Sequence, residues 1–344
     1  MNSTDEAIAG LERALLQAAR DAGLDVTGIS ALHRLSGGAN KENWAFILAF
    51  RDGFTRRLVL RREPAGARFA TKGMSTVAGE AAVIRVAARA GVPVPEVLFT
   101  LAPDSPVGDG YVMQRIVGET FGGRVLKLPE LEQTRATLAR RCGEVLAQLH
   151  RAVDSPDVAA LGLRQVTPEA ALEGLETRHR DNGDCRPVFD YALQWLHRNL
   201  PRTDALALVH GDFRNGNLVV GPDGLRAVLD WELAHIGAPE SDLGWLCVTS
   251  WRFQRPDLPV GGFGTREDLL AGYTEAGGTP ITLAALHAWE VYQTMNWGVM
   301  CAGVGKQFEA GSRSVEGAVI ARRASETEFD LMRLLAPENE AWYV

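Results

Sequence analysis

Two short polar segments, HGDFRNGN at 210–217 and LDWE at 229–232, contain the residue types that bind a metal ion beside phosphate. Asp212 and Asn217 are five positions apart across a glycine-bearing loop, and Asp230 follows Asn217 by thirteen positions. Mg²⁺ is usually held by one or two oxygen side chains together with substrate phosphates. Asn217 and Asp230 therefore suit a metal ion, which leaves Asp212 to orient a hydroxyl group.

A simpler interpretation is that both segments are loop turns, since Asp, Asn and Gly are ordinary turn residues. The order and spacing of Asp212, Asn217 and Asp230 favour a functional site over that alternative. A basic residue upstream, Arg61, and an acidic one, Glu80, favour it further.

The first segment resembles the H-x-D-x-x-x-x-N catalytic loop of the aminoglycoside phosphotransferase and choline kinase family, relatives of protein kinases. LDWE resembles the metal-binding Asp segment of the same family. The resemblance implies a protein-kinase-like two-lobe α+β fold with a small antiparallel-sheet N-lobe and a larger, mainly helical C-lobe. It also implies ATP, with GTP as an alternative, and Mg²⁺ as cofactors. Asp212 would then be catalytic, and Asn217 and Asp230 would hold the metal.

Kinase-like lobes pair a basic residue at the end of the third strand with a Glu on the next helix, and the pair grips the nucleotide phosphates. Here these positions carry Arg61 and Glu80. Most relatives have Lys where Arg61 stands, but Arg is permanently charged and binds phosphate bidentately. None of the four lysines, Lys41, Lys72, Lys127 and Lys306, is expected at a strand end where it could substitute.

The resemblance also predicts the remaining nucleotide contacts. Gly37, Gly38 and Asn40 occupy the expected phosphate-covering loop between the first two strands. The segment YVMQR at 111–115 resembles the hinge between lobes, where Met113 would border the adenine ring and Arg115 would lie beside it.

Other residues near the two segments are more ambiguous. Arg214, two residues past Asp212, either contacts the transferred phosphate or is a surface arginine. His210 and Asp242 are expected to brace the loop, and Glu232 is taken as a turn residue slightly in preference to a metal neighbour. The tryptophans of the C-terminal part could line an acceptor pocket, but tryptophans at helical spacing more often form core.

Periodicity and chain breakers predict the elements that position these residues. Helices are expected at about 3–20, 75–90, 130–153, 168–180 and 188–200, and again from 265 to the C-terminus. Strands are expected at about 29–35, 43–50, 57–61, 96–100 and 111–116, with short broken strands within 206–231. We therefore predict an N-terminal nucleotide-binding lobe at 1–115 and a C-terminal catalytic and acceptor-binding lobe at 116–344.

Composition excludes several classes of protein. The 344 residues carry 36 Lys and Arg against 43 Asp and Glu, a formal charge of −7, without a basic run. Nucleic-acid and anionic-membrane binders need a basic surface, so neither partner is expected. The four cysteines form no C-x-x-C pair, and a zinc or redox site is not indicated. No targeting or membrane-spanning segment is recognised, so a cytoplasmic location is expected; the sequence does not indicate the oligomeric state.

The sequence thus predicts a kinase that phosphorylates a hydroxyl group of a small molecule. Arg61 and the motifs GVPVP at 91–95 and DWE at 230–232 resemble kinase domains fused to acyl-CoA dehydrogenases, which implies a hydroxyacyl-CoA-type acceptor. Acidic residues outnumber arginines between positions 230 and 290, which would also permit a cationic aminoglycoside. The remaining alternative is a nucleotide-binding pseudokinase that regulates a partner protein.

Overall fold

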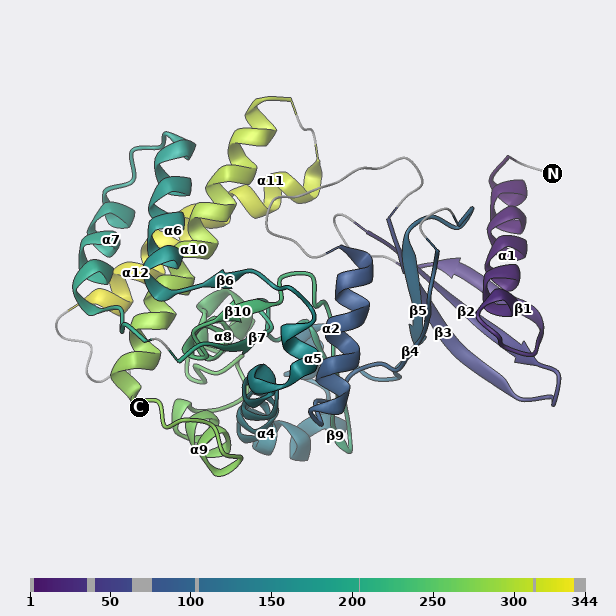
Figure 1. Cartoon of the computed structure of the whole chain (residues 1–344). Coiled ribbons are helices and arrows are strands. Elements are labelled where there is room, and N and C mark those ends of the chain that lie inside the picture. Colours follow the sequence, from purple (N-terminus) through teal and green to yellow (C-terminus); the bar gives the residue numbers. More distant parts are fainter. Residues whose placement is uncertain are drawn as a thin grey trace.

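The computed structural model describes residues 3–35, 41–63, 76–102, 105–203, 205–311 and 314–336, with side chains from residue 6 onward. A sheet-rich part formed by the first third of the chain adjoins a larger helical part (Figure 1). The predicted α+β arrangement is confirmed. Gly37, Gly38 and Asn40, predicted to cover the phosphates, lie outside the described residues. Across the described ranges, no helix combines the length and apolar character needed to cross a bilayer.

The sheet-rich part is a five-stranded antiparallel sheet with the strand order β1-β2-β3-β5-β4. Three strands precede its second helix and two follow it, as predicted. Its elements are α1 (Ser3–Asp21), β1 (Val26–Arg34), β2 (Glu42–Phe50), β3 (Thr55–Arg62), α2 (Val77–Arg89), β4 (Val97–Thr100) and β5 (Gly110–Gln114).

The central strand β3 explains why Arg61 faces inward. Successive side chains of a strand point to opposite faces, and Leu58 and Leu60 belong to the core that α1 covers. Val59 and Arg61 occupy the other face and line a cavity there. In Figure 1, α1 lies on the outer side of the sheet, whereas α2 lies toward the helical part.

Helix α2 is packed into the main core of the molecule. Its apolar residues, among them Val77, Ala81 and Ile84, join one buried cluster with α4, α8 and α9 of the helical part. The side chain of Thr76 caps the helix by accepting from Gly79 N. Glu80, in the first turn, is fully buried, so the core that holds α2 also fixes the position of the Glu80 carboxylate.

The helical part begins after the hinge. Its helices are α3 (Gly122–Val125), α4 (Glu132–His150), α5 (Pro156–Ala159), α6 (Pro168–Asn182), α7 (Pro187–Asn199), α8 (Glu240–Cys247), α9 (Arg266–Glu275), α10 (Leu283–Glu309), α11 (Val315–Ala321) and α12 (Arg323–Leu335). Single 3₁₀ turns are η1 (Pro129–Leu131), η2 (Arg151–Asp154) and η3 (Thr249–Arg252).

Two small sheets hold the polar segments among these helices. β8 (Leu218–Gly221) and β9 (Gly224–Val228) form the hairpin between the two motifs, and β7 (Ala207–Val209) ends just before the first motif. β7 pairs with β10 (His235–Gly237), which follows the second motif and also pairs with β6 (Gln165–Val166). Both motifs therefore lie in loops that strands anchor at each end.

Several predicted boundaries differ from the observed ones. The predicted helix at 130–153 is divided, because 3₁₀ turns flank α4 on both sides. The continuous helical region predicted from residue 265 is four helices, α9 to α12. β6 and β10 were not predicted, since two- and three-residue strands carry no usable alternation.

Helices α4 and α9 cross closely enough to exclude side chains at the contact. A Cβ atom at Gly143 would overlap the Leu269 carbonyl oxygen and lie 2.7 Å from Tyr273 N. Both atoms are backbone, so neither can rotate away. This contact fixes α4, which carries His150, against the helix that carries Tyr273.

We therefore expect Gly143→Ala to lower the free energy of unfolding by about 1–3 kcal/mol, the usual cost of overpacking. Gly10→Ala in α1 is the control, since no atom lies within 4 Å of its added Cβ. It should raise stability by up to about 1 kcal/mol through helix propensity. Urea unfolding measures both, and equal effects at the two glycines would contradict the packing argument.

Candidate active site

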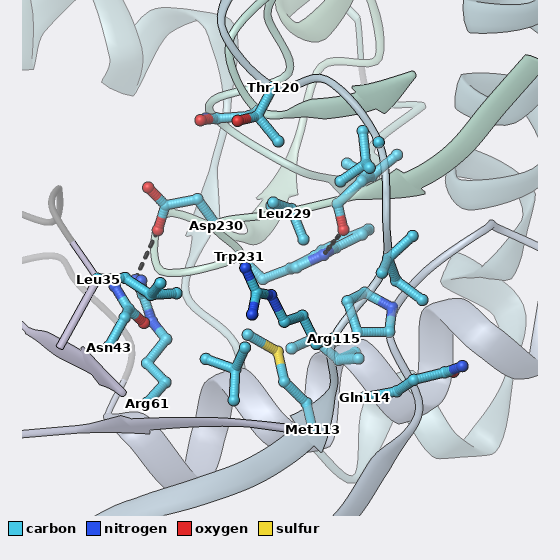
Figure 2. A pocket seen from close by; sticks show the side chains of 18 of the residues that line it. Leu35, Asn43, Arg61, Met113, Gln114, Arg115, Thr120, Leu229, Asp230 and Trp231 are labelled. Carbon is cyan, nitrogen blue, oxygen red and sulfur yellow. Dashed lines mark hydrogen bonds and ion pairs between the residues drawn. The ribbon is translucent and has the colours of Figure 1, made fainter. Parts of the chain in front are cut away.

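A cavity of about 470 Å³ lies between the sheet and the helical part. Figure 2 shows the side chains that converge on it from β3, the hinge and the second motif. This volume is in the range of small-molecule sites. Its lining includes Leu35, Asn43, Val59, Arg61, Ile84, Pro95, Tyr111, Met113, Gln114, Arg115, Thr120, Gly216, Asn217, Val219, Leu229, Asp230 and Trp231.

Arg61 makes ion pairs with three carboxylates, one on α2 and two in the second motif. Its guanidinium lies 3.0 Å from Glu80 of α2, 2.6 Å from Asp230 and 3.2 Å from Glu232. The Arg61–Asp230 pair is the dashed contact beside Asp230 in Figure 2. The resemblance to kinase-like lobes predicted the Arg61–Glu80 pair, but it did not predict that the same arginine also binds the proposed metal ligand Asp230.

Lys41 corrects the expectation that no lysine could contribute. It immediately precedes β2, is buried, and places Nζ 2.8 Å from Glu80 and 3.3 Å from Glu232. Antiparallel pairing explains the placement: Glu42 at the start of β2 lies opposite Arg62 at the end of β3. The β2–β3 pairing could have revealed this neighbour of Arg61, whereas a search for a lysine at the end of β3 could not.

Glu232 likewise contradicts its interpretation as a simple turn residue, because it pairs with both Lys41 and Arg61. Burial raises the pKa of Glu232, and the nearby Asp230 raises it further. For Arg61, burial disfavours the charged form, yet Glu80 and Asp230 hold its pKa above the ordinary value. These buried charges therefore depend on one another.

The Asp212 carboxylate is held by three donors. Trp245 Nε1 lies 2.6 Å and Arg214 Nε 3.0 Å from Oδ1, while Asn217 Nδ2 lies 2.6 Å from Oδ2. Burial raises the pKa of Asp212, and the Arg214 charge opposes that shift. The donors thus fix the direction of an acid group that burial makes more basic than a surface aspartate.

Asp242 braces the backbone of this loop. Its buried carboxylate accepts from the backbone N–H groups of His210 (2.7 Å) and Gly211 (2.9 Å), and it lies 3.2 Å from His150 Nε2. The His210 ring in turn lies 3.0 Å from the Leu229 carbonyl, which joins the two motifs. His210 and Asp242 therefore have the structural positions expected for them.

The remaining oxygen groups suit a divalent cation. The side-chain nitrogen of Asn217 donates to Asp212, so the side-chain oxygen of Asn217 is available. The backbone N–H of Leu229 donates to the backbone carbonyl of Asn217 at 2.8 Å. That contact brings Asp230 beside Asn217. Asp230 has φ 68°, a left-handed conformation that is costly for a non-glycine residue and typical of functional sites.

Glu80, Asp230 and Glu232 also place carboxylate oxygens within 4.8 Å of one another. Lys41 and Arg61 bind both glutamates, so Asp230 is the member of this group best placed to bind a metal from the cavity.

Two of the other residues predicted to contact the nucleotide lie at the cavity. Met113 and Arg115 both line the cavity and are labelled in Figure 2. Tyr111, on the same strand, was missed, although alternation along β5 puts it on the same face as Met113. It donates to Glu80 over 3.3 Å.

A tryptophan cluster adjoins the catalytic loop. Trp245 packs against Trp251 and Trp297 with ring centroids 5.2 and 6.2 Å away. The Arg214 guanidinium lies 4.5 Å from the Trp251 ring centroid, a cation–π distance. Arg214 therefore bridges Asp212 and this aromatic cluster. Trp289 belongs to a different core cluster. It therefore does not form one wall with Trp245, Trp251 and Trp297.

Comparison with known proteins agrees with this geometry. Residues 31–278 match the model of the family described as "Phosphotransferase enzyme family". "Acyl-CoA dehydrogenase family member 11" of Gallus gallus is 31% identical over 251 residues, which cover 67% of this chain and 31% of that protein. "Acyl-CoA dehydrogenase family member 10" of Mus musculus is 28% identical over 298 residues, covering 80% and 27%. The chain thus spans about a third of the length of these relatives.

Among solved structures, an aminoglycoside phosphotransferase mutant in ternary complex with AMP-PNP and hygromycin B matches with a TM-score of 0.62. The match covers 95% of this chain and 99% of that one at 20% identity, so it shows the shared fold.

We expect Asp242→Asn to lower the free energy of unfolding by about 3 kcal/mol, because it removes a buried charge from three donors. Burial opposes ionisation, but the bonds from His150 and the His210 backbone hold the pKa of Asp242 below its ordinary value. A carboxyl group whose pKa is lowered on folding stabilises the protein at pH values above its unfolded-state pKa. This stabilisation is lost as the pH falls through the folded-state pKa. The loss of unfolding free energy in Asp242→Asn, called the deficit below, should therefore persist from pH 7 down to about pH 4.

Urea unfolding across this pH range measures the deficit. Asp257→Asn is the matched control, because Asp257 is exposed and pairs with Arg255 in the same turn, and it should change stability little. A deficit for Asp242→Asn no larger than for the control would show that Asp242 does not brace the loop.

Proposed function

This chain belongs to the phosphotransferase enzyme family, and we propose that it transfers the γ-phosphate of ATP, with Mg²⁺, to a hydroxyl group of a small molecule. The observation that carries the proposal is the arrangement of Asp212, Asn217 and Asp230. Asn217 connects Asp212 with Asp230, because its side chain donates to Asp212 and its backbone carbonyl accepts from the residue before Asp230. Phosphoryl transfer depends on positioning and charge neutralisation, which such an arrangement supplies.

Asp212 would accept or orient the proton of the acceptor hydroxyl. Its three donors fix the carboxylate, and its raised pKa moves it toward the range where a carboxylate accepts a proton more readily. Arg214 remains partly exposed beside it, which suits a contact to the transferred phosphoryl group. Both roles follow from their position beside the cavity.

Asn217 and Asp230 would hold the Mg²⁺ ion, which neutralises phosphate charge when bound. Arg61, set by Glu80, would bind the α- and β-phosphates. We expect Arg61 to exchange its bond to Asp230 for these phosphate contacts when the metal ion takes Asp230. Met113, Arg115 and the hinge backbone line the part of the cavity proposed for the adenine ring.

For the acceptor we propose a hydroxyacyl-CoA-type molecule in preference to an aminoglycoside. A polycationic substrate needs free carboxylates, yet most acidic residues between 230 and 290 already have partners. Asp230 and Glu232 bind Arg61, Asp242 braces the loop, and Glu290 is buried between Arg252 and Arg266. Asp257 and Asp268 have local partners, and Glu275 pairs with Arg140 of α4.

A second cavity contains cationic groups. It measures about 710 Å³ and lies between η3, which carries Trp251, and the start of α12. Arg322 and Arg323 line it, and Glu326 pairs with both. Asp330 also lines it, and burial raises the pKa of that carboxyl to about 6. The cavity is therefore not strongly acidic, which agrees better with an acceptor that carries phosphates.

We expect Asp212→Ala to reduce turnover by at least 100-fold, a typical effect of losing a group that acts in proton transfer. Binding of Mg-ATP should stay within about threefold, because Asp212 is itself assigned no bond to the metal or the phosphates and only orients Arg214 and Asn217. Coupled ADP release and calorimetry measure the two effects. Asp223→Ala, in the exposed β8–β9 turn, is the control, and wild-type turnover in Asp212→Ala would sink the assignment.

Acceptor preference gives a separate test. With Mg-ATP and a panel of alcohols, we expect kcat/KM for a hydroxyacyl-CoA to exceed that for aminoglycosides by at least 100-fold, detected as a phosphorylated product by mass spectrometry. The same acyl-CoA without its hydroxyl group should give no product.

A preference for aminoglycosides would instead identify an antibiotic kinase. Nucleotide binding without turnover of any alcohol would favour a pseudokinase.

A further inference from the structure

Two cations and two glutamates form a closed ring of ion pairs behind the cavity. Lys41 lies 2.8 Å from Glu80 and 3.3 Å from Glu232, and Arg61 lies 3.0 Å and 3.2 Å from the same two carboxylates. Each cation therefore contacts each glutamate. The side chains are 5%, 10%, 0% and 17% exposed for Lys41, Arg61, Glu80 and Glu232, so water contributes little to their neutralisation.

The ring is electrically balanced only while both cations are present. Asp230 adds a third carboxylate through Arg61. When a metal ion takes Asp230 and phosphates attract Arg61, Glu80 and Glu232 still need positive charge, because a buried carboxylate without a partner is strongly destabilised. Within the described part of the chain, Lys41 is the other cation that contacts both glutamates.

Lys41 and Arg61 differ in their access to the cavity. Arg61 lines it, and Figure 2 shows its side chain reaching toward Asp230, whereas Lys41 is not among the lining residues. Lys41 is therefore placed to act on the glutamates and not on a ligand. Its position before β2 ties the sheet to α2 through Glu80 and to the second motif through Glu232.

We propose that Lys41 is a positioning residue that neutralises Glu80 and Glu232, and so frees Arg61 to bind the nucleotide phosphates. The inference rests on the proposed ATP-dependent function. Lys41 thereby explains how Arg61 can serve at the end of β3, where most relatives have a lysine. Without Lys41, both glutamates would hold Arg61 away from the phosphates.

The test compares Lys41→Met with wild type, since methionine keeps the length of the side chain and removes its charge. Calorimetry should show Mg-ATP binding weakened at least tenfold, with adenosine binding changed less than twofold, because adenosine has no phosphate for Arg61. Unchanged adenosine binding also shows that the site is folded. Lys127→Met, at an exposed lysine, is the matched control and should bind Mg-ATP as wild type does.

The double variant Lys41→Met with Glu232→Gln separates positioning from direct contact. Once the metal ion has taken Asp230, removing the Glu232 charge leaves Glu80 as the one glutamate of the ring that holds Arg61, so Mg-ATP affinity should return to within about threefold of wild type. A Lys41→Met variant that binds Mg-ATP normally would overturn the proposal, and so would a double variant as weak as Lys41→Met. A wild-type chain that binds no Mg-ATP would contradict the proposed function itself.

Discussion

The bond between Arg61 and Asp230 connects the two parts of this molecule at the point where its chemistry is proposed to occur. Arg61 comes from the central strand of the sheet, and Asp230 comes from the loop after β9. Both groups are charged, and Arg61 is largely buried, so each depends on the other for neutralisation. A nucleotide with its metal ion must replace that interaction with one of comparable strength. The surrounding glutamates and Lys41 determine how readily Arg61 can make the exchange.

The loop that carries Asp212 depends on a second constraint, which is the orientation of its backbone by Asp242. That carboxylate belongs to α8, which packs against α10 in the core of the helical part. His150 of α4 and Tyr273 of α9 extend the same hydrogen-bonded chain. The close α4–α9 contact at Gly143 therefore contributes to the position of Asp212, although neither helix touches the cavity. The reactive groups are held by side chains whose own positions the core fixes.

Much of this arrangement could be predicted from the sequence because its signals are local. The HGDFRNGN and LDWE segments carry their spacing within one stretch of chain, and alternation marks the strands that place Arg61 and Met113. Lys41, Glu232 and Trp245 were missed or misjudged because their roles depend on pairings between distant segments. Lys41 reaches Glu80 only through the β2–β3 register, and Trp245 reaches Asp212 from α8. Hydrophobic periodicity cannot specify which polar atoms meet across such elements.

A crystal structure with Mg²⁺ and a non-hydrolysable ATP analogue would test the central claim most directly. We predict the metal ion between Asn217 and Asp230, with Arg61 separated from Asp230 and bound to phosphate oxygens. Arg61 should remain paired with Glu80, and Lys41 should still contact Glu80 and Glu232. A nucleotide bound with the Arg61–Asp230 pair intact, or bound outside this cavity, would contradict the account.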